Sequence, residues 1–314
     1  MKTLKMILFL MIIAFLIMGQ ESCQSSSTTD EANPFVGGTE GLQVSFDDDR
    51  PPEYVESGGT WPFYVTLKLQ NKGEAYVEGK NVRIVISGPE PSSFSVNPGS
   101  MIKESIEEDI YPVKKDAEGN VRVPVEVYST FGELNYKQKL DTNFKFNIRA
   151  DVCYNYYTDA RANGCIVRDP TLSETQAYCI VKEEKPIFNS GAPLQITKFE
   201  ELPAGQDRIK YIFTIEHSDT GGRFFLPNTK CDDPRTTENK IHFSIETGKT
   251  ELSCTPISGG GMSGDVYLGR DGTIDVTCIQ KIAATTDYPD LIKIRLSYDY
   301  LQNKETPFMV KAIE

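Results

Sequence analysis

The sequence predicts an all-β protein made of two tandem antiparallel β-sandwich domains that follow an N-terminal signal or anchor segment. Three observations predict this fold class. Apolar and polar residues alternate with a period of two over many short segments, turn residues separate these segments, and several strings of residues recur in both halves of the chain. Almost nothing after residue 40 has the spacing of an amphipathic helix, so helices are expected only as short turns.

The first element is an export signal at residues 1–22. Lys2 and Lys5 precede an uninterrupted apolar run over residues 6–18, and a polar tract follows. Positive charge, apolar run and polar tract in that order are the parts of a signal peptide, and the run is shorter than the ~20 residues that cross a bilayer comfortably. We therefore expect a cleaved leader in preference to a permanent membrane-spanning helix.

Cys23 stands where a lipoprotein cysteine stands, just after the apolar run and before a Ser/Thr tract at residues 25–29. Ser22 fits the small residue that precedes such a cysteine, whereas Gln20 does not fit the Leu-like residue expected three positions before it. Lipid attachment at Cys23, plain secretion and an uncleaved anchor therefore all remain open. In each case residues 23–40 are expected to form a flexible tether that holds the domains at the extracellular face of the cell membrane.

The body of the chain is expected to consist of half-buried antiparallel strands, because its alternating segments place apolar side chains on one face. In the first half these apolar residues are Val65, Leu67 and Leu69; Val82, Ile84 and Ile86; Val121, Val123, Val125 and Val127; and Phe144, Phe146, Ile148, Ala150, Val152 and Tyr154. In the second half they are Ile209, Tyr211, Phe213 and Ile215; Ile241, Phe243 and Ile245; Ile274, Val276 and Cys278; and Ile292, Ile294, Leu296 and Tyr298. Strands this short and this regularly interrupted are typical of immunoglobulin-like sandwiches.

Two immunoglobulin-like domains, over residues 41–188 and 192–314, are expected to have arisen by tandem duplication. Three pairs of strings match between the halves: residues 41–44 and 193–196, 67–71 and 213–217, and 149–156 and 293–300. The alternative to duplication is that such strings are common to all β-sandwich proteins. The third pair carries four tyrosines whose rings are expected in the core with their hydroxyls on nearby backbone: Tyr154, Tyr156, Tyr298 and Tyr300.

Composition excludes some partners and indicates a folded body. The chain has 314 residues, with 33 basic against 45 acidic residues and a formal net charge of −12. Nucleic-acid binding depends on clustered Lys and Arg, so a nucleic-acid partner is not expected. Hydrophobic residues make up 39% of the chain and aromatic residues 10%, which is too much for an intrinsically disordered protein.

The segment over residues 63–74 resembles the CARDB-like adhesion domains, in which an amphipathic strand ends in an Asn-x-Gly turn; here the turn is Asn71-Lys72-Gly73. The string over residues 33–42 is similar to uncharacterised exported proteins of small-genome archaea. The resemblance covers mainly residues 33–90. It implies an immunoglobulin-like fold on a cell surface and brings no known catalytic residue with it.

The sequence offers little catalytic chemistry. His217 and His242, the two histidines, lie in separate predicted strands without metal-ligand spacing, so a zinc site or a Ser-His-Asp site is not expected. Asp219-Thr220-Gly221 has the letters of the aspartic-protease triplet, but that chemistry needs a second carboxylate, and none stands at the equivalent place, residues 71–73. We interpret the triplet as a hairpin turn. Together these observations predict that the protein is not an enzyme.

Two further segments are interpreted as loops. The glycine-rich stretch at residues 258–264 lacks a Walker lysine and a following helix, so it is predicted to connect strands and not to bind phosphate. Asp47, Asp48 and Asp49, with Glu53 or Glu56, offer carboxylate oxygens to calcium, but their spacing does not match an EF-hand loop. A run of solvated acids is the favoured interpretation, and no other cofactor is expected.

Six cysteines lie in the body of a chain with an export signal, and none has the Cys-x-x-Cys spacing of a zinc site, which indicates disulfides. The expected bonds are Cys165–Cys179 and Cys254–Cys278, each of which restrains a turn-rich excursion. Cys153 and Cys231 are left over. Because Cys153 aligns with Ser297 of the other repeat, it is expected to be a buried free thiol.

These observations predict a non-catalytic cell-surface protein of the adhesion, envelope or surface-assembly class, which contacts surface proteins or glycans. The alternative is an accessory binding subunit tethered beside a secreted enzyme or transporter. Self-association of the purified protein would favour the first function, and co-purification with one enzyme or permease would favour the second.

Overall fold

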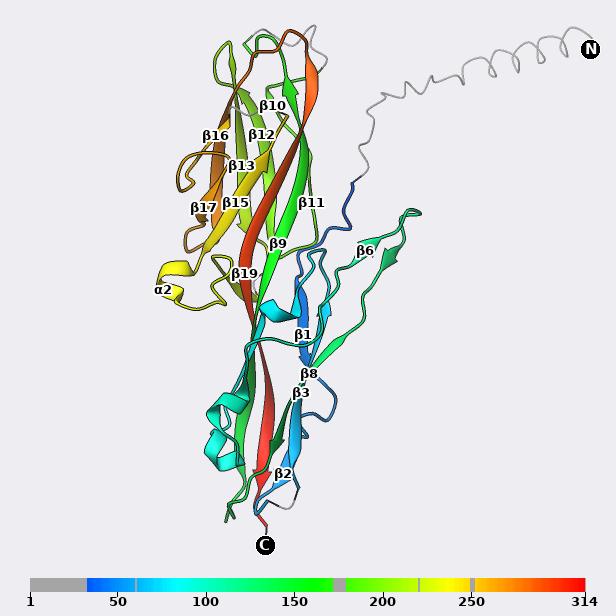
Figure 1. Cartoon of the computed structure of the whole chain (residues 1–314), viewed down its shortest axis with the longest axis vertical. Helices are drawn as coiled ribbons and strands as arrows, with labels where there is room; N and C mark the ends of the chain where they lie inside the picture. The colour runs from blue at the N-terminus through cyan, green and yellow to red at the C-terminus, as the bar shows by residue number, and fades with distance from the viewer. Residues whose placement is uncertain (1–32, 60, 172–178, 220, 249–251, 314) are drawn as a thin grey trace, which may run out of the picture. The chain divides into compact units, whose positions relative to one another are not determined.

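The computed structural model describes residues 33–59, 61–171, 179–219, 221–248 and 252–313, and the described residues from Pro34 onward form one compact unit. The described residues form β-strands in mainly antiparallel sheets, and their helices are short turns, which confirms the all-β prediction (Figure 1). The predicted leader at residues 1–22 and Cys23 lie outside the described residues. No helix among the described residues is both long and apolar enough to cross a membrane.

The first half of the chain contributes two layers of strands to a shared core. One sheet has the order β1-β3-β8, and the other layer contains β4, β5 and part of β9. The bounds are β1 (Leu42–Phe46), β2 (Tyr54–Glu56), β3 (Phe63–Asn71), η1 (Gly79–Asn81), β4 (Val82–Ser87), η2 (Pro91–Phe94), η3 (Pro98–Met101), β5 (Ile102–Lys103), β6 (Lys114–Lys115), β7 (Val121–Arg122), β8 (Val127–Leu134) and β9 (Phe144–Ile166).

The second half repeats this arrangement with more strands. One sheet has the order β10-β12-β13-β18-β16, and the other layer contains β17, β15 and β19. The bounds are β10 (Glu183–Glu184), β11 (Ile187–Asn189), β12 (Leu194–Pro203), β13 (Arg208–His217), β14 (Gly222–Phe225), α2 (Pro234–Thr237), β15 (Lys240–Glu246), β16 (Leu252–Thr255), β17 (Ser263–Tyr267), β18 (Thr273–Lys281) and β19 (Tyr288–Lys311).

The two halves are joined by their last strands, β9 and β19, which are 23 and 24 residues long. They pair in antiparallel register from Tyr288↔Ile166 to Val310↔Phe144, side by side in Figure 1. The end of β19 therefore lies in the first half, where the Phe308 ring stacks on Phe63 with 4.9 Å between ring centroids. The end of β9 lies in the second half in the same way. Each half thus completes its sheet with residues from the other.

The strings that match in sequence occupy matching places in the sheets. Leu42 of β1 pairs with Asn71 of β3, and Leu194 of β12 pairs with His217 of β13. The Leu42 amide donates to the Tyr154 hydroxyl at 3.1 Å, and the Leu194 amide to the Tyr298 hydroxyl at 3.5 Å. The four tyrosines are fully buried, so their predicted core role is confirmed: Tyr154, Tyr156, Tyr298 and Tyr300.

A two-fold relation between β9 and β19 follows from these registers. Tyr154 faces Tyr300 and Tyr156 faces Tyr298 across the two strands, with Asn155 opposite Asp299 at the centre. Because β9 and β19 run antiparallel, the two strings that match in sequence pair with each other at the centre of these strands. They do not lie in two separate halves of the molecule. Residues 157–166 accordingly pair with residues 288–297, and residues 144–153 pair with residues 301–310.

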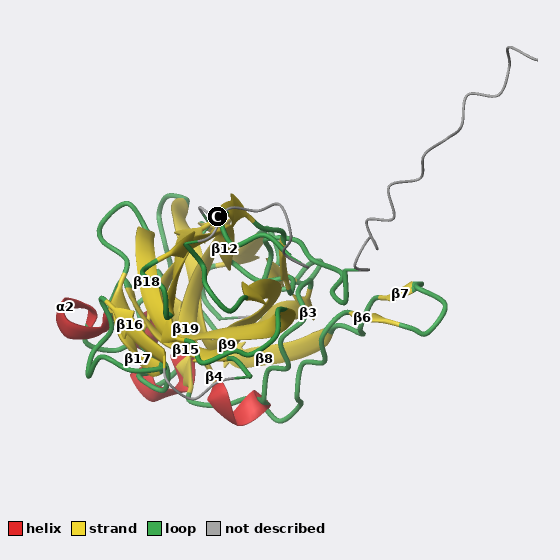
Figure 2. Cartoon of the chain, turned by 90° about the horizontal axis from the view of Figure 1, so that it is seen from above, coloured by secondary structure: helices red, strands yellow, loops and turns green. Residues whose placement is uncertain are grey.

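Two alternating segments depart from their predicted burial. Phe144, the first residue of β9, is 54% exposed although it is expected to face the core. Val121, Val123 and Val125 are expected to face the core, yet they are between 51% and 76% exposed, and only Val127 is buried. The pairing of β8 with β3 ends at Leu69↔Val127, so the residues before Val127 have left the sheet. Val121 belongs to the β6–β7 hairpin, which stands away from the sheets (Figure 1, Figure 2), and Val123 and Val125 lie in the segment that leads from this hairpin to β8.

Candidate functional site

The six body cysteines form three disulfides: Cys165–Cys179, Cys254–Cys278 and Cys153–Cys231. The first two are the bonds expected from the sequence. The expectation that Cys153 is a free thiol is wrong, because the segment between β14 and β15 carries Cys231 to it from 78 residues away. Three disulfides indicate folding in an oxidising, extracellular type of environment.

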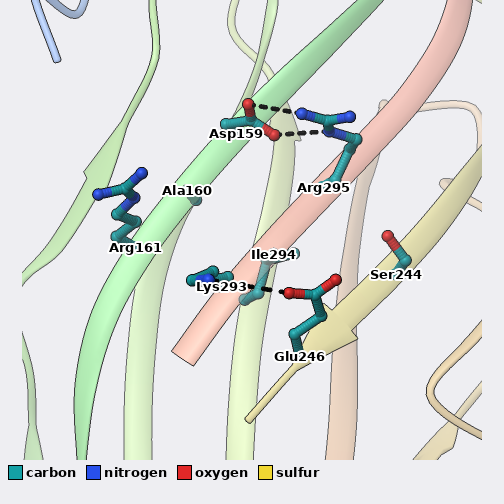
Figure 3. A pocket seen from close by; sticks show the side chains of 8 residues that line it. All are labelled: Asp159, Ala160, Arg161, Ser244, Glu246, Lys293, Ile294 and Arg295. Carbon is teal, nitrogen blue, oxygen red and sulfur yellow. Dashed lines mark hydrogen bonds and ion pairs between the residues drawn. The ribbon is translucent and has the colours of Figure 1, made fainter. Parts of the chain in front are cut away.

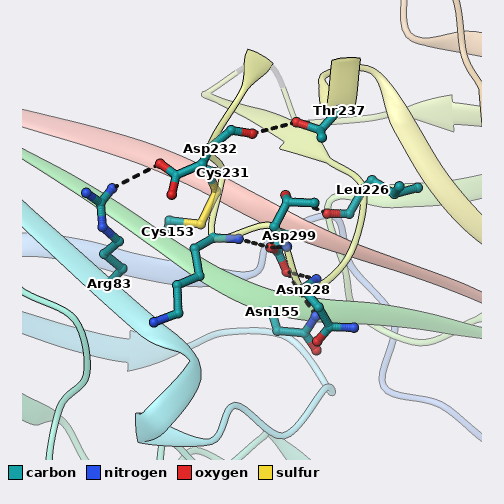
Figure 4. Close-up of a disulfide and its surroundings, with 11 residues drawn as sticks. Arg83, Cys153, Asn155, Leu226, Asn228, Cys231, Asp232, Thr237 and Asp299 are labelled. Carbon is teal, nitrogen blue, oxygen red and sulfur yellow. Dashed lines mark hydrogen bonds and ion pairs between the residues drawn. A yellow bond between two sulfur atoms is a disulfide. The ribbon is translucent and has the colours of Figure 1, made fainter. Parts of the chain in front are cut away.

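The loop that carries Cys231 is held by a buried carboxylate. The Asp299 carboxylate accepts hydrogen bonds from the Thr229 and Lys230 amides, each at 2.7 Å, and from the Asn155 side chain at 3.0 Å (Figure 4). These donors compensate the cost of burying the charge. Asp299 and the disulfide together fix this loop, so we assign both a structural role.

The same loop reaches strand residues of the first half. Arg83 of β4 lies 3.7 Å from Asp232, and Lys230 lies 3.5 Å from Glu104. Figure 4 shows Arg83 of β4 pointing to Asp232, which follows Cys231 of the disulfide on this loop. The loop therefore ties the second half to the first at the point where β9 and β19 cross between them.

The calcium candidates are not assembled into a metal site. Asp47, Asp48 and Asp49 follow β1, and Asp47 forms an isolated bridge with Arg50. Across the described ranges, no group of three or more His, Cys, Asp or Glu side chains is placed to hold a metal ion. We interpret the three carboxylates as solvated charges at a turn.

His217 and Asp219 belong to a polar cluster around the Tyr300 hydroxyl. That hydroxyl lies 2.9 Å from His217 Nε2 and 3.0 Å from Asp219 Oδ2. Burial lowers the pKa of His217 and raises the pKa of Tyr300. The Gly221 amide donates to Asp219 Oδ1 at 2.8 Å, which is a turn contact. The prediction of a hairpin is wrong, because β13 pairs with β12 and β18 whereas β14 pairs with β19 in the other sheet. The cluster therefore satisfies buried polar groups.

His242 has hydrogen-bond partners that were not predicted from the sequence. Its Nδ1 lies 2.8 Å from Asp265 Oδ1, and its Nε2 lies 2.8 Å from Ser263 Oγ. The order Asp-His-Ser is that of a nucleophilic triad. However, the His242 and Asp265 side chains are 41% and 42% exposed on an open sheet, whereas acyl transfer needs oxyanion donors in a site that excludes water.

The glycine-rich stretch leads into this cluster. It connects β16 to β17, and Ser258 closes it by bonding Asp265 twice: the Ser258 amide donates to the Asp265 carbonyl, and the Asp265 amide donates to Ser258 Oγ. Gly259 and Gly260 have φ angles of +84° and +56°, which favour glycine. The stretch is a connection between strands, as the sequence predicts.

A fully buried carboxylate lies beside the Cys165–Cys179 bond. Glu201 of β12 accepts hydrogen bonds from the Cys165 amide at 2.9 Å and 3.0 Å, and Lys185 Nζ lies 3.2 Å away. Burial nevertheless raises the pKa of Glu201 to about 7. The desolvation of the carboxylate outweighs its hydrogen bonds and its ion pair, so Glu201 titrates near neutral pH.

The strongest candidate binding site is a polar surface on β9, β15 and β19, which we call the outer face. It is lined by the side chains of Asp159, Arg161, Ser244, Glu246, Lys293 and Arg295, around a pocket of about 330 Å³ (Figure 3). Alternate residues of each strand point to this side, while Ile245 and Ile294 between them point into the core.

Two carboxylates of the outer face are already engaged. Asp159 holds Arg295 in a two-point ion pair, at 2.7 Å to Nε and 2.9 Å to Nη2, and this pair raises the pKa of Arg295. Glu246 lies 4.0 Å from Lys293 Nζ. The Arg295 guanidinium also lies over the Tyr157 ring, 4.5 Å from its centroid.

Arg161 is the cation of the outer face that belongs to neither of these ion pairs. It stands apart from the Asp159–Arg295 pair in Figure 3, and its guanidinium lies 5.7 Å from the centroid of the Phe35 ring. Within the described ranges no carboxylate lies within ion-pair distance of it. Its direct cross-strand neighbour is Lys293, another cation. The outer face therefore carries an excess positive charge in a chain of net charge −12.

The outer face was not foreseen from the sequence. Its residues come from three strands that lie far apart in the chain, and only their register brings them together. The available signal is weak: charged residues at alternate positions, such as Asp159 and Arg161 or Lys293 and Arg295, mark the solvent side of any strand. No known protein family matches the sequence, and no curated protein shows significant similarity to it.

Proposed function

We propose that the protein is a non-catalytic binding or structural component of the extracellular surface, in the adhesion, envelope or surface-assembly class. The observation that carries this proposal is the outer face, where charged side chains surround a pocket on rigid, paired strands. Exposed ion pairs contribute little to stability, so these charged side chains are not needed to hold the fold together. Polar groups held on paired strands are suited to recognition of surface proteins or glycans.

The finer architecture is part of the same proposal. We infer two immunoglobulin-like sandwich domains, over residues 41–188 and 192–314, that arose by duplication and exchange the ends of their last strands. The equivalent pairings Leu42↔Asn71 and Leu194↔His217 support the duplication, and the resemblance to CARDB-like adhesion domains supports the fold family.

Membrane attachment through the N-terminus completes the proposal, with a lipid on Cys23 as one form of it. The disulfides support an extracellular location. Mass spectrometry of the native protein should show loss of the leader and, if lipidated, acyl mass on Cys23. An intact Met1 in a soluble cytoplasmic fraction would contradict the location.

Crosslinking on intact cells tests the binding function. The protein should be captured with one recurring surface protein or glycan, and an Arg161→Ala/Lys293→Ala variant should lose that product. An Arg208→Ala/Lys210→Ala variant, which removes one Arg and one Lys from β13 in the other layer, should retain it. Loss of the product in the β13 variant alone would count against the outer face.

The non-catalytic part of the proposal is tested at Ser263. A fluorophosphonate probe should leave this serine unlabelled, because its hydroxyl lies on an open sheet with His242 and Asp265 exposed beside it. Labelling that disappears in both Ser263→Ala and His242→Gln variants would identify a nucleophile and overturn this part.

One observation favours a second candidate, the accessory subunit of a secreted enzyme or transporter. The β6–β7 hairpin and the segment after it expose Val121, Val123 and Val125, and exposed apolar patches often mark contacts with a partner protein. Under this function the wild-type protein should co-purify with one stoichiometric enzyme or permease. A Val123→Thr/Val125→Thr variant should lose it, whereas the Arg161→Ala/Lys293→Ala variant should keep it.

A further inference from the structure

The pocket of the outer face has an unbalanced set of charges. Of its three cations, Arg295 is fully engaged by Asp159, Lys293 is weakly paired with Glu246 at 4.0 Å, and Arg161 has no carboxylate partner within the described ranges. Arg161 and Lys293 face each other directly in the register of β9 and β19. Like charges on opposed residues destabilise a sheet, and Glu246 offsets this repulsion only at Lys293, so an anion bound at Arg161 would relieve it further.

The position and chemistry of the Arg161 side chain suit the binding of an oxyanion. Its guanidinium lies near the Phe35 ring, a contact that restrains a flexible side chain. A guanidinium presents its N–H donors in a planar fork that matches a carboxylate or a sulfate in a two-point contact. Lys293 supplies a second positive charge on the next strand, and Ser244 supplies a hydroxyl in the same pocket.

The position of the pocket limits the kind of ligand. β15, β19 and β9 are consecutive strands of one sheet, with β17 paired to β15 and β11 paired to β9 beside the pocket. Their backbone groups are therefore engaged in the sheet, and a peptide cannot add to it here as an extra strand. Recognition must use side chains, and those present offer cations for an oxyanion and carboxylates and a hydroxyl for ligand hydroxyls.

We propose that this pocket binds an oxyanion-bearing saccharide, with the acidic group held by Arg161 and Lys293. The inference deepens the proposed binding function by naming its ligand class, and it rests on that function. A carboxylate of a uronic acid and a sulfate ester have the same chemistry for these two side chains, so the test distinguishes them. The Asp159–Arg295 pair positions the neighbouring strands and does not contact the acidic group.

Titration calorimetry of the full chain measures binding to three probes: tri-galacturonate, its methyl ester and a sulfated heparin oligosaccharide. One of the two charged probes should bind, and the methyl ester should bind at least tenfold more weakly than tri-galacturonate if the carboxylate is the source. Binding should weaken as salt increases, because the charges are solvent-exposed. Equal binding of the ester and the acid, with no binding of the sulfated probe, overturns the inference.

Variants assign the effect to the pocket. Arg161→Ala/Lys293→Ala should weaken binding at least tenfold, and the Arg208→Ala/Lys210→Ala control, which removes the same charge elsewhere, should change it less than twofold. Glu246→Gln should strengthen binding severalfold, because it frees Lys293 and removes a negative charge; a gain of this kind cannot come from misfolding. Equal losses in the pocket variant and the control overturn the inference.

The outcomes separate this inference from the function on which it rests. If neither charged probe binds, the saccharide inference fails. The surface-binding function then still stands if crosslinking on cells captures a partner through the outer face. If crosslinking also captures nothing through this face, both fail.

Discussion

Individual buried side chains place severe limits on substitution in this protein. Glu201 is buried with a raised pKa, Asp299 is buried with a full set of donors, and Gly73 lies where a side chain has no room. The Asn71-Lys72-Gly73 turn was recognised from the sequence as the end of a strand. Its environment was not, because the atoms around Gly73 come from Glu40, Tyr156 and Gly191, far away in the chain.

Replacing Gly73 with Ala should destabilise the protein by at least ~2 kcal/mol, because the added Cβ would clash with the Gly191 carbonyl and the Tyr156 hydroxyl. Urea unfolding monitored by tyrosine fluorescence or circular dichroism measures this change. Gly99→Ala is the matched control, since nothing lies within 4 Å of its Cβ position. Equal stabilities of the two variants would show that the turn is not tightly packed.

Glu201 should make stability depend on pH between about 4.5 and about 7, its ordinary and folded pKa values. In this window the folded state keeps a proton that the unfolded state releases, so stability decreases as pH rises, by roughly 3 kcal/mol in total. Glu201→Gln should remove this decrease. Thermal unfolding across pH 4 to 8 measures it, with the neighbouring Glu200→Gln as control. A parallel pH profile in wild type and Glu201→Gln would refute the assignment.

At the level of the strands, local alternation predicted most elements but not their partners. The residues from Ile148 to Tyr154 alternate as expected and line the core, because successive side chains of a strand point to opposite faces, whereas Phe144 is exposed. Val121, Val123 and Val125 alternate equally well and are exposed, because no neighbouring strand covers them. Alternation predicts that a segment can be half-buried, and only tertiary packing decides whether it is.

The extension of β9 and β19 into each other's half could not be predicted from the sequence for the same reason. Both strings of paired tyrosines were recognised, but each strand continues well past its tyrosines into the other half. Sequence similarity identifies which segments correspond. Sequence similarity does not show whether a strand ends in its own sheet or extends into the next one. A strand from either half of the chain can satisfy the same backbone hydrogen-bonding groups.

Replacing Phe308 with Ala should destabilise the protein by about 3–5 kcal/mol through loss of its stacking on Phe63. Although Phe308 is near the end of the chain, hydrogen exchange should accelerate first in β3, in the first half. Leu291→Ala, on the exposed side of β19, should have little effect. Faster exchange confined to residues 192–281 would contradict the exchange of strand ends.

At the scale of the whole molecule, the sequence indicated the compartment, the fold class and two of the three disulfides. The outer face and the Cys153–Cys231 bond were missed, because both join residues from different halves. Cys153 aligns with Ser297, which favoured a free thiol. The connection from β13 to β15, which carries Cys231, covers residues 218–239, whereas the equivalent connection from β3 to β4 covers only residues 72–81, so no comparison of the halves could predict this disulfide.

Replacing Cys153 and Cys231 with Ser should destabilise the protein by about 4 kcal/mol, because this bond closes a long loop of the unfolded chain, with a sequence separation of 78. Replacing Cys165 and Cys179, with a separation of 14, should cost about 3 kcal/mol. Guanidinium unfolding of the two double variants compares them. A smaller loss for Cys153–Cys231 than for Cys165–Cys179 would show that the bond does not stabilise the junction of the halves.

The exchange of strand ends also sets the order in which the protein is completed. Residues 301–310, which finish the first half, are synthesised after every other strand of both halves. The first half therefore cannot close as soon as its own residues have been made, because it waits for residues 301–310. In a chain built in this way the two halves reach their final fold together, since each of the two last strands completes a sheet in both of them.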